Sequence, residues 1–246
     1  MIEHQLTFPI DGVAIVGLGP LTGAAERAAA GDAHRLVAAL TEKLALDRLT
    51  IGDRDRLLAA LYGSVYGPDV LADARCGECG AKIELRFSLE ALVAGRRPDG
   101  SAKGSPPQVS VGDASLRLPT VGDAARLGDA DPAAFVEALT TEGDAPERAL
   151  AEAALEAADP ALELDLAATC PECGAAQSTP FSMSGFFSAA LSRDLQFLMR
   201  ETHLIAKTYG WSLDAIMSLT RVERQEFVRL ILADLGVGAR SLRTAS

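Results

Sequence analysis

All four cysteines of this chain fall in two short motifs of the same type. Cys76 and Cys79 belong to a Cys-Gly-Glu-Cys-Gly segment, and Cys170 and Cys173 belong to a Cys-Pro-Glu-Cys-Gly segment. Such a turn presents two sulfur atoms on a tight loop, because its glycine can adopt a positive φ. Two such turns that face each other supply the four thiolates of a tetrahedral zinc site. The sequence therefore predicts one structural metal ion, with zinc strongly preferred.

The separation of the two motifs is unusual for such a site. Residues 80–169, ninety in all, lie between Cys79 and Cys170. A small zinc finger has much shorter spacings. We therefore expect the metal to join two distant segments of the chain, as a split four-cysteine zinc ribbon made of two β-hairpins, over about 70–89 and 162–183.

Cysteines in such motifs have three other uses. Disulfides are disfavoured because the first residues show neither the basic start nor the apolar core of a secretory signal, so the thiols are expected to stay reduced. A thioredoxin-like redox site places its first thiol at a helix start, whereas a strand-like run follows Cys79. A rubredoxin-like iron site uses similar turns and stays open as the less favoured ion. A closed four-thiolate site would hold structure and catalyse no hydrolysis.

The composition is that of an ordinary globular protein. The chain has 246 residues, 48% of them hydrophobic and 23% charged, enough for one elaborated domain or a few small ones. Its longest unbroken apolar run, residues 57–62, is too short to cross a membrane. We expect a soluble, cytoplasmic protein. The formal net charge of −11 makes nucleic acid an unlikely partner, because phosphate backbones are bound by clusters of lysine and arginine.

The hydrophobic patterns predict an α+β fold with surrounding helices and a small C-terminal helical module. We expect an N-terminal strand and helices over 1–70, the split ribbon with an inserted hairpin and Ala-rich helices over 71–183, the helical module over 184–236, and a flexible tail over 237–246. The predicted helices lie at about 32–46, 52–63, 132–141 and 146–158, and the inserted hairpin covers 109–118. The order helix, strand, cysteine motif, strand, helix occurs twice, by duplication or by convergence.

The C-terminal module is predicted in most detail. Apolar residues at three- and four-residue steps indicate one long helix from about 184 to Tyr209. Ser212 is expected to cap a short helix, with Trp211 folding onto Ile216 as a hydrophobic staple and core anchor. Thr220 and Glu223 form the expected capping box of the last helix. Its buried face is predicted to consist of Phe227, Leu230, Ile231 and Leu235.

The chain shows none of the motifs of a nucleophilic hydrolase or a phosphate-binding loop. The Gly-rich segment around Gly17 also departs from a dinucleotide-binding turn, because its third glycine comes one position late and Pro20 interrupts it. A strand followed by a loop is the better interpretation. The aspartates and glutamates are expected mostly on solvated helix surfaces. We therefore expect no catalytic residues and no enzymatic activity.

The segment from about 190 to 232, under a fifth of the chain, contains His203-Leu-Ile-Ala-Lys-Thr-Tyr-Gly-Trp211 followed by Ser212, a short helix, Leu219 and a closing helix. This segment resembles the T4-like phage baseplate hub assembly family, which is also found beside phage-tail-like contractile injection systems. The resemblance implies a non-catalytic structural or assembly component of such a baseplate, with hub, spike or other baseplate proteins as partners. It places the protein in the cytoplasm or within an assembled particle. The residues expected to contact a partner are Tyr209, Trp211, Leu219 and Phe227.

Two alternative functions stay open from the sequence. One is a zinc-ribbon regulator associated with nucleic acid, which the net charge disfavours. The other is a rubredoxin-like electron-transfer protein with iron in the four-cysteine site.

Overall fold

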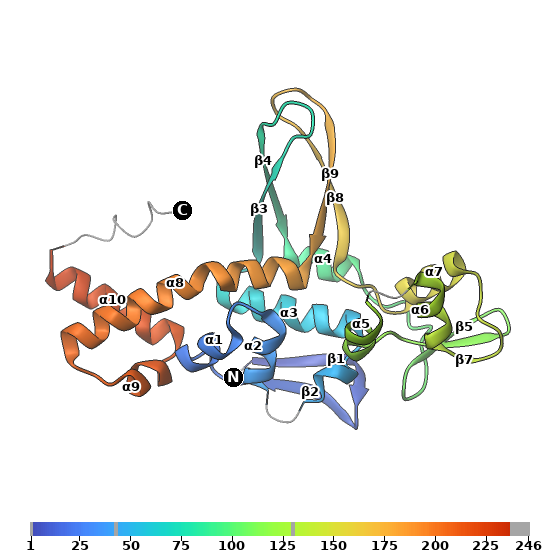
Figure 1. Cartoon of the computed structure of the whole chain (residues 1–246), viewed down its shortest axis with the longest axis horizontal. Coiled ribbons are helices and arrows are strands. Elements are labelled where there is room, and N and C mark those ends of the chain that lie inside the picture. Colours follow the sequence, from blue (N-terminus) through green and yellow to red (C-terminus); the bar gives the residue numbers. More distant parts are fainter. Residues whose placement is uncertain (1, 42–43, 129–130, 237–246) are drawn as a thin grey trace. The chain divides into compact units, whose positions relative to one another are not determined.

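Helices and strands alternate along most of this chain (Figure 1). The computed structural model describes residues 2–41, 44–128 and 131–236. The strands are β1 (Ile2–Ile10), β2 (Val13–Leu18), β3 (Asp69–Arg75), β4 (Lys82–Ser88), β5 (Gln108–Val111), β6 (Ala114–Arg117), β7 (Thr140–Glu142), β8 (Glu163–Thr169) and β9 (Ala176–Ser182). The helices are α1 (Gly23–Ala29), α2 (Ala33–Leu40), the 3₁₀ helix η1 (Leu46–Arg48), α3 (Ile51–Tyr66), α4 (Leu89–Gly95), α5 (Val121–Leu127), α6 (Pro132–Leu139), α7 (Arg148–Ala158), α8 (Met183–Tyr209), α9 (Leu213–Ser218) and α10 (Arg221–Asp234). The expected α+β class is confirmed.

The residues divide into two compact units that are not continuous in the sequence. The first unit combines Met1–Ile2, Gly17–Glu42 and Gly185–Ser246, and the second combines Glu3–Val16 and Lys43–Ser184. The predicted tail over 237–246 lies outside the described residues. Within the part of the chain that the structure describes, every helix is too short or too polar to span a bilayer.

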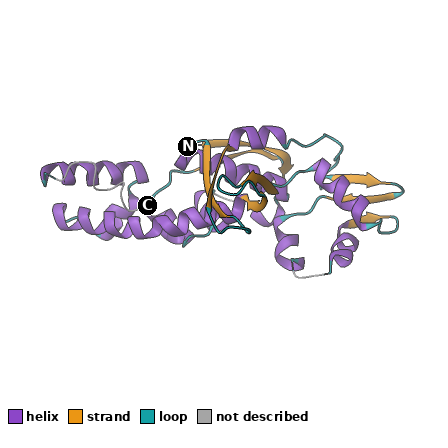
Figure 2. Ribbon diagram, turned by 90° about the horizontal axis from the view of Figure 1, so that it is seen from above, coloured by secondary structure: helices purple, strands orange, loops and turns teal. Residues whose placement is uncertain are grey.

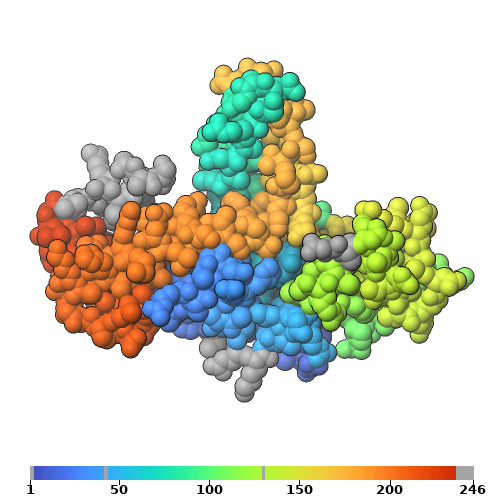
Figure 3. All heavy atoms as spheres, viewed as in Figure 1, coloured from blue at the N-terminus to red at the C-terminus, as the bar shows by residue number. Residues whose placement is uncertain are grey.

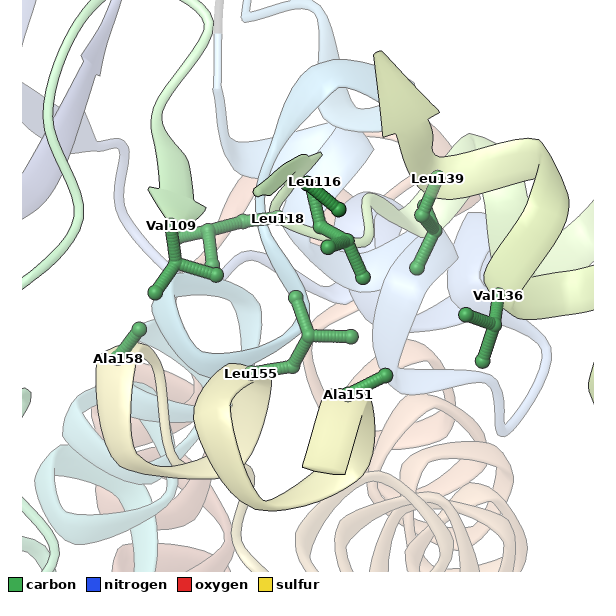
Figure 4. Close-up of a cluster of buried hydrophobic side chains, with 9 residues drawn as sticks. Val109, Leu116, Leu118, Val136, Leu139, Ala151, Leu155 and Ala158 are labelled. Carbon is green, nitrogen blue, oxygen red and sulfur yellow. The ribbon is translucent and has the colours of Figure 1, made fainter. Parts of the chain in front are cut away.

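The described strands form four small sheets: β1 with β2, β3 with β4, β5 with β6 and β7, and β8 with β9. The last three sheets are antiparallel and lie within the second unit. The three-stranded sheet of β5, β6 and β7 packs on α6 and α7 around one hydrophobic cluster (Figure 4). Leu116 and Leu139 are completely buried in it, and Ala151 lets α7 approach closely. The predicted inserted hairpin and both Ala-rich helices are confirmed.

Helices α3 and α5 begin side by side in this unit. Each is capped by a threonine, Thr50 or Thr120, and the two threonines form an isolated antiparallel β-bridge. The amide of Ile51 donates to the carbonyl of Pro119, and the amide of Val121 donates to that of Leu49. The bridge therefore ties the start of one helix to the start of the other.

The first unit repeats this arrangement with α1 and α10. Thr22 caps α1, Thr220 caps α10, and the two residues form a second antiparallel bridge. Helices α8, α9 and α10 share a hydrophobic cluster that contains Ile205, Ile216 and their apolar neighbours. Figure 2 shows the backbone of the chain coloured by helix, strand and loop. The predicted caps at Ser212 and Thr220, including the capping box, are confirmed.

A buried charge network joins three helices of the first unit. Arg224 of α10 is only 1% exposed and donates to Glu26 of α1 and to Glu201 of α8. Arg221 donates to the same Glu26 and to Asp194 of α8. A charge this deep is tolerated only when it is paired and hydrogen-bonded, as it is here.

Several predicted details are wrong. The helix expected over 32–46 ends at Leu40, because Thr41 adopts an extended conformation and its hydroxyl donates back to the carbonyl of Val37. Leu230 and Leu235 are exposed, since Val228 and Arg224 take the buried face of α10 together with Ile231. The short elements α1, α5 and β7 were not predicted, because each is too brief to show a clear hydrophobic period.

The internal repetition reaches beyond the cysteine motifs. Helices α1 and α2 of the first half match α5 and α6 of the second half in length and capping residue. After each second helix a threonine, Thr41 or Thr140, donates its hydroxyl to the carbonyl four residues back, at 2.8 and 2.9 Å. The structure thus favours duplication over convergence as the origin of the repeat.

Candidate metal centre

Each cysteine motif connects the two strands of a regular hairpin. In the first hairpin the register runs from Asp69 opposite Ser88 to Arg75 opposite Lys82. The second hairpin has the same register, and every paired position is shifted by 94 residues. The predicted hairpins around both motifs are confirmed. The cysteines therefore lie at corresponding positions at the ends of two equivalent hairpins.

The turns themselves have one geometry. The amide of Cys76 donates to the carbonyl of Ala81, and the amide of Gly80 donates back to the carbonyl of Cys76, both at 2.9 Å. The second turn repeats both bonds with the same distances. Gly80 has a φ of +72° and Gly174 a φ of +73°. This is the left-handed region that the glycine of the motif was expected to occupy.

The two hairpins pack against each other along their length (Figure 3). Near their bases, the rings of Phe87 and Phe181 meet edge to face at a centroid distance of 5.2 Å. Near their tips, the amide of Gly77 donates to the side-chain oxygen of Gln177 at 2.9 Å. Contacts between protein groups alone thus align the two hairpins so that their cysteine pairs lie beside each other.

Helix α3 brings the second hairpin back to the first. Its C-terminal end leads into β3, and its N-terminal turn binds the segment before β8. Asp55 accepts from the amide of Leu162 at 2.8 Å. Asp159 accepts from the amide of Gly52 at 3.0 Å and from Arg56 at 2.6 Å. These contacts explain how motifs ninety residues apart reach one place.

The four sulfur atoms lie within 4.8 Å of one another. The Sγ atoms of Cys76 and Cys173 are 3.6 Å apart, and those of Cys79 and Cys170 are 3.7 Å apart. These distances are far too long for disulfides, and all four residues are free cysteines. A tetrahedral zinc ion with Zn–S bonds of about 2.3 Å requires sulfur atoms about 3.8 Å apart. The group could therefore hold one metal ion.

Burial and charge around the sulfurs also suit a cation. Cys76 and Cys170 are buried among small apolar side chains, whereas Cys79 and Cys173 are exposed. Hydrogen bonds from the backbone amides of Cys79 and Glu78 lower the pKa of the Cys76 thiol to about 7. Several thiolates this close repel one another, so full ionisation of the group requires a positive ion among them.

The residues predicted to contact a partner are only partly brought together. Tyr209, Trp211 and Phe227 form a cluster of three rings, with centroid distances of 5.0–5.7 Å. Trp211 is 38% exposed, so the prediction that it anchors the core is wrong. Leu219 ends α9 instead, and its carbonyl accepts from Gly23 and Arg224.

Sequence reasoning missed the buried carboxylates that position the hairpins. The acidic residues were expected mostly on helix surfaces, but Asp53, Asp55 and Asp159 are 0%, 0% and 6% exposed. Burial raises the pKa of Asp55 and Asp159, although Arg54 and Arg56 oppose that shift. A sequence signal for a structural aspartate was present, since the motif Thr-x-Gly-Asp-x-x-Arg occurs at both 50–56 and 120–126.

Comparisons with protein-family models, curated proteins and solved structures return no match.

Proposed function

We propose that the four cysteines hold one structural zinc ion and that the two hairpins form a split zinc ribbon. The proposal depends on the sulfur distances of 3.6 and 3.7 Å, which are close to the edge of a zinc–thiolate tetrahedron. Four cysteine ligands leave no position for a substrate or a reactive water. The ion would therefore stabilise the pair of hairpins.

Metal analysis tests this directly. We expect the purified protein to contain one equivalent of zinc and to lose it when Cys79 and Cys173 are both replaced by serine. These two cysteines are the exposed ones, so their substitution disturbs packing least. Ser101→Ala serves as a control that keeps the metal, because Ser101 is an exposed residue outside the cysteine motifs. Zinc-free protein, with all four thiols reactive toward a thiol reagent, would refute the proposal.

Iron is the second candidate for the same four sulfurs. Four cysteine thiolates also bind iron in electron-transfer proteins. A red protein with visible charge-transfer absorbance would favour this function, and a colourless zinc protein would exclude it. A role with nucleic acid has less support, because the net charge of −11 opposes binding to phosphates.

We further propose that the protein is a non-catalytic component of the baseplate or hub of a phage-tail-like contractile injection system. The observation that carries this proposal is the resemblance of residues 190–232 to the baseplate hub assembly family. The ring cluster supports it, because Tyr209 and Trp211 are exposed beside the half-buried Phe227, and partly exposed aromatic residues are frequent anchors of protein interfaces.

Co-purification with hub or spike subunits tests the proposed role. We expect a Tyr209→Ala, Trp211→Ala double variant to lose at least tenfold of the recovered partner. Val222→Ala is a matched control, because Val222 is 76% exposed on the same module and lies outside the ring cluster. Circular dichroism checks that both variants fold. Normal tail assembly with the double variant would contradict the role assigned to the rings.

A further inference from the structure

The four sulfur atoms of the metal centre differ in their access to solvent. Cys79 and Cys173 are exposed, whereas Cys76 and Cys170 are only 3% and 1% exposed. Figure 1 shows both turns at the same end of the paired hairpins, so each turn offers one sulfur to small molecules in solution. The susceptibility of a thiol to oxidation follows its exposure, so an oxidant reaches Cys79 and Cys173 first.

Each exposed sulfur is in contact with a buried sulfur of the other hairpin. The Sγ atom of Cys79 lies 3.7 Å from that of Cys170, and the Sγ atom of Cys173 lies 3.6 Å from that of Cys76. A disulfide has an S–S distance of about 2.05 Å, so each pair has to close by roughly 1.6 Å. This movement is on the scale of a side-chain adjustment, and it leaves the strands where they are.

Contacts between protein groups keep these pairs together when the metal leaves. The hydrogen bond from Gly77 to Gln177 joins the hairpins near their tips, and the rings of Phe87 and Phe181 meet near their bases. Small apolar side chains around Ile83 fill the space beside the buried cysteines. None of these contacts includes a metal–sulfur bond. The hairpins therefore stay paired while the sulfurs react.

We propose that the metal centre is a redox-convertible clasp. In this proposal hydrogen peroxide releases the zinc ion and leaves two disulfides between the hairpins, Cys76–Cys173 and Cys79–Cys170. The inference rests on the proposed function, since it takes the resident ion to be zinc. The metal joins the hairpins under reducing conditions, and covalent bonds join them under oxidising conditions.

The reaction balances for each pair of sulfurs. One peroxide oxidises the exposed thiolate to a sulfenic acid, with uptake of one proton and release of one water. The buried thiolate then attacks the sulfenic sulfur, so that the S–S bond forms, the S–O bond breaks and the hydroxide leaves with a second proton as water. Two peroxides accept four electrons from the four sulfurs. Zinc has no redox chemistry and leaves as Zn²⁺.

Disulfide mapping of the full-length, zinc-loaded protein tests the proposal. The protein is treated with hydrogen peroxide while a chromogenic chelator reports free zinc, and the remaining thiols are then alkylated. A protease that cleaves after glutamate separates the two cysteines of each motif, at Glu78 and at Glu172. We expect two peroxides to be consumed for each zinc released, and mass spectrometry to find the two cross-hairpin disulfides. Reduction and added zinc should restore the metal.

Two double variants isolate the role of exposure. Cys79→Ser with Cys170→Ser keeps the contact between exposed Cys173 and buried Cys76, and it should form their disulfide. Cys79→Ser with Cys173→Ser keeps only the two buried cysteines, and its oxidation should be slower by about tenfold or more. Circular dichroism verifies that both variants are folded. Equal rates of oxidation would overturn the role of the exposed sulfurs.

Mapping of the wild type decides the connectivity, even if a variant does not fold. Disulfides within one motif, Cys76–Cys79 or Cys170–Cys173, would overturn the inference, and so would zinc that stays bound in peroxide. Both results leave the zinc site itself intact. Protein purified without metal refutes the zinc site instead, and a lack of cross-hairpin disulfides after peroxide treatment of that protein then refutes the clasp as well.

Discussion

At the scale of single residues, the conformation of Gly80 and Gly174 sets the direction in which each cysteine pair points. Both have a positive φ, and a Cβ atom at either position would meet nothing within 4 Å. Crowding is therefore not the reason for glycine at these positions. Glycine is required by the backbone conformation, because an L-residue with a side chain is strained in the left-handed region.

We expect Gly80→Ala to destabilise the protein by about 1–2 kcal/mol, the usual cost of this strain. Urea unfolding measures the change. Gly95→Ala is the matched control, because Gly95 also has free space around it but ends a helix without a positive φ. Equal effects of the two substitutions would show that the turn tolerates a side chain.

The carboxylate of Asp123 makes the stability of the protein depend on pH. Burial raises the pKa of its carboxyl, but hydrogen bonds from Arg117 and Thr120 outweigh burial and hold this pKa well below its usual value. A depressed pKa in the folded state stabilises the protein above the unfolded pKa of about 4, and this stabilisation is lost as the pH falls below it.

We expect Asp123→Asn to cost about 2 kcal/mol near neutral pH, since charge-assisted hydrogen bonds are removed. The difference from the wild type should shrink as the pH is lowered from about 5 to about 2.5. Denaturant unfolding at several pH values provides the measurement. A difference independent of pH would mean that the charge of Asp123 contributes nothing.

At the scale of elements, the buried network around Arg224 connects α10 with α1 and α8. We expect Arg224→Met to destabilise the first unit by about 3–5 kcal/mol, because Glu26 and Glu201 lose a buried partner. Arg229→Met, which breaks the exposed pair with Glu226, should cost at most about 1 kcal/mol. Similar losses in the two variants would show that the buried pairing is unimportant.

Sequence reasoning succeeded for elements whose pattern is local. The cysteine hairpins, the long helix α8 and the caps at Ser212 and Thr220 each follow from a few adjacent residues. Sequence reasoning failed where contacts between distant segments determine which side chains are buried. The exposure of Leu230 depends on Arg224 occupying the buried face, and Arg224 is buried only because Glu26, almost two hundred residues earlier, pairs with it.

At the candidate site, too, the local motif was predicted and the long-range contacts were not. Spacing alone identified the four cysteines, because the turn motif is specific. The carboxylates that bring the hairpins together were missed, since the binding of Asp159 by Gly52 and Arg56 involves residues more than a hundred positions apart. Helical periodicity contains no information about such contacts.

At the scale of the whole molecule, each unit has a hydrophobic cluster of its own, around Leu116 in one and around Ile205 in the other. If zinc stabilises only the hairpins, its removal should act on one unit. We expect a chelator to accelerate hydrogen exchange in β3, β4, β8 and β9 and to leave the amides near Ile205 and Ile231 protected.

Hydrogen exchange followed by mass spectrometry resolves the two regions. Structural zinc contributes roughly 10–16 kcal/mol of apparent binding free energy in zinc-finger peptides, so the effect on the hairpins should be large. Re-addition of zinc should restore the original rates. Unchanged exchange in all four strands after complete metal removal would contradict a stabilising role.

The shift of 94 residues between the hairpins also has a consequence for biosynthesis. Ribosomes add about 5–20 residues per second, so Cys170 follows Cys76 after about 5–20 seconds. During that interval the nascent chain exposes a lone pair of thiols whose counterpart has not been made. A newly made protein must therefore keep Cys76 and Cys79 reduced and uncommitted until translation of the second half is complete.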